Sequence, residues 1–139
     1  MILLDTNVLS ALMQIAPDET VARWLDRQPS DSIWTTSVTV MEIHFGLRTM
    51  PAGRRHSALT EALGILMEEK IQGRIASFDV SAAEQAAELM ALRKAKGRPV
   101  DFRDTTIAGI ALATRATLAT RNTTHFEDLS VRVVNPWKD

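Results

Sequence analysis

The chain has 139 residues, of which 45% are apolar and 24% charged, and this is the composition of one ordinary globular domain rather than of a disordered chain. It contains no cysteine, so disulfides and thiolate metal sites are excluded and a reducing compartment fits. The net charge of −1 neither indicates nor excludes nucleic-acid binding. The start of the chain is a poor signal peptide and no apolar run approaches about 18 residues, which together predict a cytoplasmic protein without a membrane span.

The chain opens with four apolar residues, Met1–Leu4, that lead directly into Asp5, Thr6 and Asn7. A short unbroken apolar run predicts a strand buried on both faces, as in a parallel sheet. Asp-Thr-Asn is typical of a turn and a helix cap. We therefore expect Asp5 where a central strand ends and a helix begins, at the edge of the sheet where open α/β folds bind ligands.

Helices and strands alternate along the rest of the chain. Periodicity, caps and breakers predict helices over residues 8–13, about 19–27 with Asp18 as cap, 37–49, about 56–70, 81–96 and 103–115. The first turn of the helix over 81–96 contains a predicted capping box, Ser81-x-x-Glu84. Strands are expected over residues 32–36, 74–78, 117–120 and 131–134. This order, with short connections, predicts an α/β fold with a parallel or mixed sheet.

Three acids lie at positions that are predicted to face the core or the edge of the sheet, where acidic residues are uncommon. Asp5 follows a strand, and Asp104 shares a face with apolar residues of the helix over 103–115. Glu42 lies along the predicted apolar face of its helix, which is formed by Val38, Met41 and Phe45. Each has an ordinary alternative: Asp5 as a helix cap, Glu42 in a capping box with Thr39, and Asp104 near a helix N-terminus capped by Asp101. Taken together they should converge at one edge of a parallel sheet, where their repulsion requires protonation or a bound cation. Carboxylate oxygens without cysteine favour Mg²⁺ or Mn²⁺.

Four segments, LLDTNVLS, TSVTVMEIHFGL, DFRDTTIAGIALA and LATRNTTHF, resemble the four motifs of PIN-domain ribonucleases, most closely the VapC/FitB branch of toxin–antitoxin pairs. The resemblance implies a single-domain PIN-like α/β/α sandwich over residues 1–139, with a mainly parallel sheet of four to five strands. It implies RNA cleavage by metal-activated water with Mg²⁺, for which Mn²⁺ could substitute, and it makes Asp5, Glu42 and Asp104 the catalytic and metal-holding residues. It also implies a homodimer, a small antitoxin whose tail blocks the site, and DNA contact only through that antitoxin.

The fourth motif departs from the family pattern. Many members have an acid where this chain has Asn122, and others place an acid three residues later, where this chain has His125. An amide oxygen can bind a hard cation but adds no charge, so we expect Asn122 to hold a second metal only weakly. Thr6 and Thr120 could donate hydrogen bonds to the carboxylates or to phosphate, although packing is the ordinary role of such threonines, and Arg121 could position RNA.

Basic residues near the motif ends are candidates for contact with the RNA backbone, with a solvated surface as the alternative for each one: Arg48, Arg54, Arg55, Lys94, Lys96, Arg98, Arg103 and Arg121. The three histidines, His44, His56 and His125, are expected in surface or loop roles. The chain has no tyrosine, and its Trp and Phe residues fall mostly at core-like positions, so the RNA target is not revealed.

Two other functions compete with a nuclease. A catalytically weakened PIN scaffold could serve as a protein-binding partner in a DNA-bound antitoxin/repressor complex, since Asn122 replaces an acid. A phospho-acceptor receiver domain also has an acidic Mg²⁺ pocket, but it needs an acid pair near the first strand and a lysine after a late strand, and neither is present.

Overall fold

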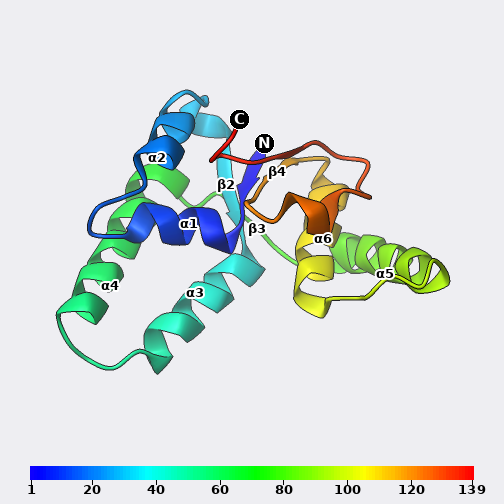
Figure 1. Ribbon diagram of the computed structural model, residues 1–139, viewed down its shortest axis with the longest axis horizontal. Helices are drawn as coiled ribbons and strands as arrows, with labels where there is room; N and C mark the ends of the chain where they lie inside the picture. Colours follow the sequence, from blue (N-terminus) through cyan, green and yellow to red (C-terminus); the bar gives the residue numbers. More distant parts are fainter.

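Five short strands form one parallel sheet in the computed structural model, which describes residues 1–139. The strands are β1 (Ile2–Leu4), β2 (Ile33–Thr36), β3 (Ile75–Ala76), β4 (Thr117–Ala119) and β5 (Val133–Val134). They lie in the order β3-β2-β1-β4-β5, and each neighbouring pair is parallel. The expected sheet is therefore confirmed, with β1 at its centre (Figure 1).

All the predicted helices are present, with ends that differ by a few residues. They are α1 (Thr6–Met13), α2 (Glu19–Asp26), α3 (Ser37–Thr49), α4 (Arg54–Leu66), α5 (Val80–Ala95) and α6 (Phe102–Thr114). Two 3₁₀ turns, η1 (Ser30–Ser32) and η3 (Thr123–Phe126), and a π turn that extends α4, η2 (Met67–Ile71), complete the fold. No helix combines the length and the apolar character needed to cross a membrane.

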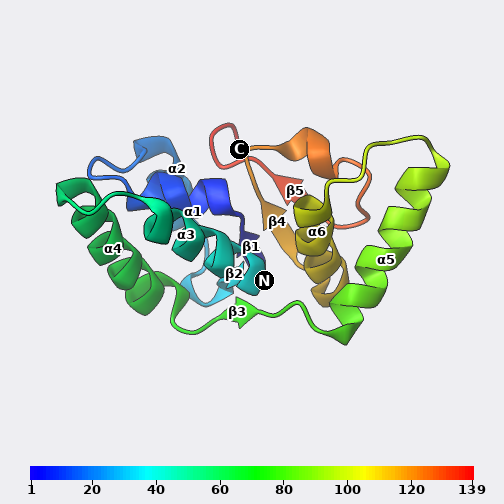
Figure 2. The same cartoon turned by 90° about the horizontal axis from the view of Figure 1, so that it is seen from below.

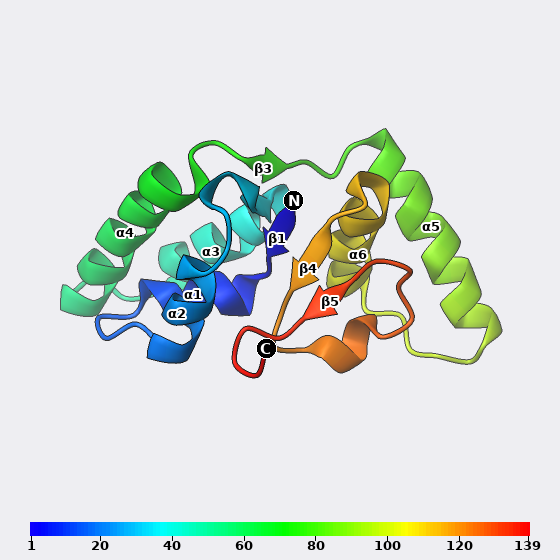
Figure 3. The same ribbon diagram turned by 90° about the horizontal axis from the view of Figure 1, so that it is seen from above.

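A helical layer covers each face of the sheet, as the views along the sheet show (Figures 2 and 3). Successive strand residues point to opposite faces, so Leu4 packs with buried side chains of α1, α2, α3 and α4, whereas Leu3 packs with those of α5 and α6. Both leucines are fully buried. The apolar run at the start of the chain is thus a strand buried on both faces, and the α/β/α sandwich is confirmed.

The path of the chain changes direction next to β1. From β1 the chain moves outward to β2 and β3, and it then returns through α5 and α6 to β4 on the other side of β1. Right-handed crossovers in opposite directions place their helices on opposite faces. The carboxyl ends of β1 and β4 therefore form a topological switch point, which is where α/β sheets bind ligands.

Helix α3 presents a different face to the core from the one predicted. Val38, Met41 and Phe45 were expected to point inward, but Met41 is 62% and Phe45 63% exposed, while Ile43 and Leu47 are buried. The buried side follows the four-residue spacing of Ile43 and Leu47, and Val38 lies at its margin. The prediction is confirmed for Val38, which is buried, and wrong for Met41 and Phe45. Two apolar stripes are available on this helix, and its neighbours α1, α4 and α6 select between them.

The aromatic residues are less buried than expected. Phe126 is fully buried and Trp24 nearly so, but Phe102 is 72% exposed, and Phe45 and Phe78 are exposed as well. The prediction of core positions was therefore wrong for three of the four phenylalanines.

Helix caps were predicted with mixed success. Asp18 and Asp101 cap α2 and α6 as expected, each accepting a hydrogen bond from a first-turn amide. The capping box Ser81-x-x-Glu84 was wrong, because Asp79 caps α5 and its Oδ1 accepts a 2.9 Å bond from the amide three residues later. An aspartate two residues before a serine is an equally good cap, and sequence alone does not rank them.

Candidate active site

Asp5 lies at the carboxyl end of the central strand and its side chain is fully buried. Its Oδ1 accepts a 2.8 Å hydrogen bond from the amide of Thr6, so Asp5 is the N-cap of α1. Its Oδ2 accepts a 2.8 Å hydrogen bond from the hydroxyl of Thr120, the residue that follows β4. The capping role is therefore confirmed, and the same carboxylate also lies at the switch point between β1 and β4.

Glu42 approaches Asp5 from α3. The capping-box alternative was wrong, because Thr36 caps α3 and accepts a 3.0 Å bond from the amide of Thr39. The Glu42 side chain turns instead toward α1, where its Oε1 accepts a 2.8 Å hydrogen bond from the hydroxyl of Thr6.

Asp104 lies in the first turn of α6, with its amide bonded to Asp101 Oδ1 at 2.8 Å. Its carboxylate is nearly buried. The Nδ1 of His125 lies 2.8 Å from Asp104 Oδ2. His125 is in an exposed turn, as expected of a loop residue, with 55% of its side chain exposed, but its ring contacts an acid from the site.

Arg103 joins these three acids. Its guanidinium pairs with Asp5 at 2.9 Å through Nη2, with Glu42 through Nε and with Asp104 through Nη1. Nη2 also donates to the Thr6 hydroxyl at 3.1 Å. Arg103 was a candidate for RNA contact, with a solvated surface as the alternative, and its guanidinium points inward to the acids instead. Side chains of consecutive helix residues do not face each other. Sequence periodicity therefore does not predict that Arg103 turns toward Asp104.

The electrostatics of the site centre on this guanidinium. Partial burial opposes its charge, but the hydrogen bond to Glu42 and the negative charges of Asp5, Glu42 and Asp104 outweigh burial and raise the pKa of Arg103 above its ordinary value. Three carboxylates so close to one another require such a positive charge, because buried anions without a partner are costly.

In each carboxylate, one oxygen is hydrogen-bonded to a neighbouring threonine or histidine side chain and the other faces the guanidinium of Arg103. Thr120, Thr6 and His125 hold the outer oxygens of Asp5, Glu42 and Asp104 respectively. The other oxygen of each acid faces a different nitrogen of the guanidinium. In this arrangement no three acid or histidine side chains are grouped closely enough to hold one metal ion. The carboxylates surround a guanidinium, which is larger than a metal ion.

Of the other candidate site residues, the two threonines contact the acids, whereas the side chains of Asn122 and Arg121 do not. Thr6 and Thr120 donate hydrogen bonds to Glu42 and Asp5, which is the role that the sequence left open beside packing. Asn122 is exposed and its side chain makes no hydrogen bond to the acids, although its amide donates to the Thr120 hydroxyl at 3.1 Å. The guanidinium of Arg121 stacks on Trp137, 4.7 Å from the ring centroid, so it is turned toward the end of the chain.

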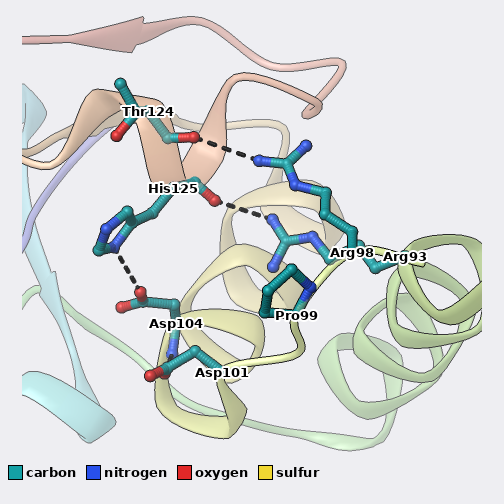
Figure 4. A pocket seen from close by; sticks show the side chains of 7 residues that line it. All are labelled: Arg93, Arg98, Pro99, Asp101, Asp104, Thr124 and His125. Carbon is teal, nitrogen blue, oxygen red and sulfur yellow. Dashed lines mark hydrogen bonds and ion pairs between the residues drawn. The ribbon is translucent and has the colours of Figure 1, made fainter. Parts of the chain in front are cut away.

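A polar pocket of about 370 Å³ adjoins Asp104 (Figure 4). Arg93 is almost completely buried beside it, pairs with Asp128 at 2.8 Å and donates to the carbonyl of His125 at 2.9 Å. Arg98 lines the same pocket. The structural role of Arg93 was not predicted, although Arg93 lies in line with the buried small and apolar residues of α5, which is a detectable signal.

A second hollow, of about 290 Å³, lies on the other side of the acids. Thr6 and Glu42 line it, together with Arg55 from the start of α4. Basic side chains therefore flank the acid centre on both sides: Arg98 beside Asp104 and Arg55 beside Glu42.

A parallel α/β/α sheet with three carboxylates at its switch point places the chain among the α/β domains with an acidic site at the carboxyl edge. Residues 2–131 match the family model of the PIN domain. The chain is 38% identical to a VapC ribonuclease of Sinorhizobium fredii over 99% of both chains, and 34% identical to toxin FitB of Neisseria gonorrhoeae over the full length of both. A solved structure of FitAB bound to an IR36 DNA fragment superposes with a TM-score of 0.89 at 33% identity, covering 100% of this chain and 97% of that one. The chain therefore belongs to the PIN domain family, within the group that contains VapC ribonucleases and toxin FitB.

Proposed function

We propose that this protein is the toxin of a toxin–antitoxin pair and a metal-dependent endoribonuclease, with residues 1–139 acting as one PIN domain. In this proposal Asp5, Glu42 and Asp104 hold Mg²⁺, for which Mn²⁺ could substitute. The observation that carries it is the meeting of three carboxylates, from three distant segments, around one positive charge. The similarity to a VapC ribonuclease and a toxin supports the choice of RNA as substrate.

The donor set fits a hard divalent cation. Three carboxylates supply only oxygen ligands, which Mg²⁺ and Mn²⁺ prefer. Asp5 and Asp104 are buried, and buried carboxylates are tolerated only with a compensating positive charge. Asn122 is exposed and only its backbone amide is hydrogen-bonded near the acids. In this proposal its side chain therefore adds at most a weak ligand for a second ion, and one tightly held ion is enough.

When bound, a divalent ion supplies an activated water at neutral pH and a clamp on the phosphate. Thr120 and Thr6 fix the outer oxygens of Asp5 and Glu42, and His125 does the same for Asp104. The inward oxygens, which pair with Arg103 in this structure, would hold the ion. Supporting hydrogen bonds of this kind tune metal sites.

The flanking cations provide a path for the RNA backbone. Arg55 and Arg98 lie on opposite sides of the acids, so phosphates on either side of the cleaved bond would each meet a positive charge. Arg121 is a weaker candidate for positioning RNA, because its guanidinium is stacked on Trp137.

The protein partners follow from the relatives. We infer that a small antitoxin binds this chain and blocks the acid centre with its tail, that two copies of the chain pair, and that DNA is contacted only through the antitoxin. The FitAB structure bound to a DNA fragment, at 33% identity, supports a DNA-bound complex of this kind.

RNA cleavage by an Asp5→Asn variant tests the proposal. The unmodified protein should cleave an unpaired model RNA with Mg²⁺, lose activity with a chelator and recover it with Mn²⁺. Asp5→Asn should lose about 10²-fold or more of this activity, the loss that follows removal of one charge-stabilising group from an active site. Asparagine still caps helices, so folding should be preserved.

Asp18→Asn is the matched control, because Asp18 also caps a helix but lies outside the acid site. It should cleave RNA as well as the unmodified protein does. Full activity in Asp5→Asn, or activity that survives the chelator, would refute the proposal. If the protein bound its antitoxin but cleaved no RNA, it would instead be a catalytically weakened binding scaffold.

A further inference from the structure

Arg103 contacts all three acids at once, which the proposed metal-dependent reaction does not require. Its three guanidinium nitrogens each face a different carboxylate, and one of them also donates to Thr6. No other basic side chain forms an ion pair with Asp5 or Glu42. Arg103 therefore supplies the positive charge that the acids need in this structure.

A guanidinium and a metal ion cannot occupy this centre together. The oxygens that Arg103 binds are the inward oxygens of the three acids, and these are the oxygens that would bind the ion. Ligand bonds to Mg²⁺ are about 2 Å long, so the carboxylates would have to move into the space that the guanidinium now fills.

Arg103 has a route out of the site. It lies in the first turn of α6 and its side chain is 31% exposed. An arginine has a long flexible stem that can carry its charged head to solvent while the backbone stays fixed. Leaving would cost Arg103 its three ion pairs, which the incoming metal would replace for the carboxylates.

We propose that Arg103 is an internal counter-cation that closes the acid centre until a divalent metal displaces it. This inference rests on the proposed function, because it assumes that the metal binds Asp5, Glu42 and Asp104. It makes metal binding weaker than the acids alone would allow, since only the fraction of molecules with Arg103 withdrawn can bind. If Arg103 occupies the centre nine-tenths of the time, the apparent Kd for metal rises about tenfold.

Calorimetric titration of the metal-free full chain with Mn²⁺ tests the proposal without measuring cleavage. Arg103→Met should bind Mn²⁺ at least about tenfold more tightly than the unmodified protein. Arg103→Lys keeps the charge but lacks the planar fork that bridges several carboxylates, so its affinity should fall between the two. Arg98→Met is the matched control, because it removes the same charge from the neighbouring pocket, where Arg98 pairs with Asp128 and Glu127. Its affinity should stay within about twofold of the unmodified protein.

Two failures have separate meanings. If the unmodified protein binds Mn²⁺ and Arg103→Met binds it equally or more weakly, the closing role of Arg103 is overturned while the proposed metal site stands. If neither binds Mn²⁺, the metal site fails and this inference fails with it.

A Mg²⁺ titration of the unmodified protein, followed by NMR, tests the same proposal even if the Arg103→Met variant does not fold. The Nε–H signal of Arg103, assigned by its loss in Arg103→Lys, should be protected from solvent exchange without metal. It should lose that protection with the same midpoint as Mg²⁺ binding. A signal that stays protected at saturating Mg²⁺ would overturn the proposal.

Discussion

Helices α5 and α6 pack closely at Gly109, which makes this glycine a sharp test of the fold that carries Asp104. A Cβ atom added at Gly109 would lie 2.5 Å from the carbonyl oxygen of Ala82 and 2.8 Å from the Cβ of Ala86. Packed carbon atoms lie about 3.5–4.0 Å apart, so the two helices would have to separate by roughly 0.7 Å. Gly109→Ala should therefore destabilise the protein.

The size of this effect follows from two opposing contributions. Overpacking a well-packed site costs about 1–3 kcal/mol, whereas replacing a glycine inside a helix by alanine gains about 0.5–1 kcal/mol. Because the added Cβ would meet a backbone oxygen at 2.5 Å, the upper half of the overpacking range applies. The net loss in the free energy of unfolding should then be about 1–2 kcal/mol. For a chain of this length that corresponds to a Tm lower by roughly 3–8 °C.

Gly64→Ala is the matched control, because Gly64 lies inside α4 with no atom within 4 Å of the added Cβ. This variant should gain up to about 1 kcal/mol. Urea unfolding and thermal melting of both variants, compared with the unmodified chain, measure the difference. A Gly109→Ala variant as stable as Gly64→Ala would refute the close packing of α5 on α6.

Two further predictions concern the surroundings of the acids. Hydrogen bonding to Arg93 lowers the pKa of Asp128 in the folded protein. The Arg93–Asp128 pair therefore stabilises the fold fully at pH values above the pKa of an aspartate in the unfolded chain, about 3.9. This stabilisation is lost as the pH falls through the lower pKa that Asp128 has in the folded protein. Breaking a fully buried ion pair costs about 3–5 kcal/mol. Asp128 is partly exposed, so Asp128→Asn should lower the free energy of unfolding at pH 7 by about 3 kcal/mol or less. Its urea midpoint should then fall less than that of the unmodified protein between pH 5 and pH 3, and an equal fall would contradict the prediction. Thr120→Val removes the hydroxyl that donates to buried Asp5 and should cost about 1.5–3 kcal/mol, and an unchanged urea midpoint would show that Asp5 does not depend on it.

The sequence by itself determined the framework of the site. An apolar strand that ends in Asp5 and an alternation of helices and strands predict a parallel sheet, and the carboxyl ends of parallel strands share one edge. Asp104 lies in the first turn of a helix that follows a short loop, and Glu42 lies in the second turn of the helix that directly follows β2. Backbone geometry alone therefore brings the three acids to the same edge.

Tertiary structure decided which side chains face which partner. Arg103 was a candidate for RNA contact or for a solvated surface, and it lies among the acids instead. His125 contacts Asp104, and α3 exposes Met41 and Phe45, which were expected in the core. A long flexible side chain such as arginine takes its direction from charges on segments distant in sequence, and an amphipathic helix takes its orientation from the surfaces packed around it. Periodicity and spacing describe one segment at a time, so they set the positions of Asp5, Glu42 and Asp104 along the backbone but not the cation that lies between them.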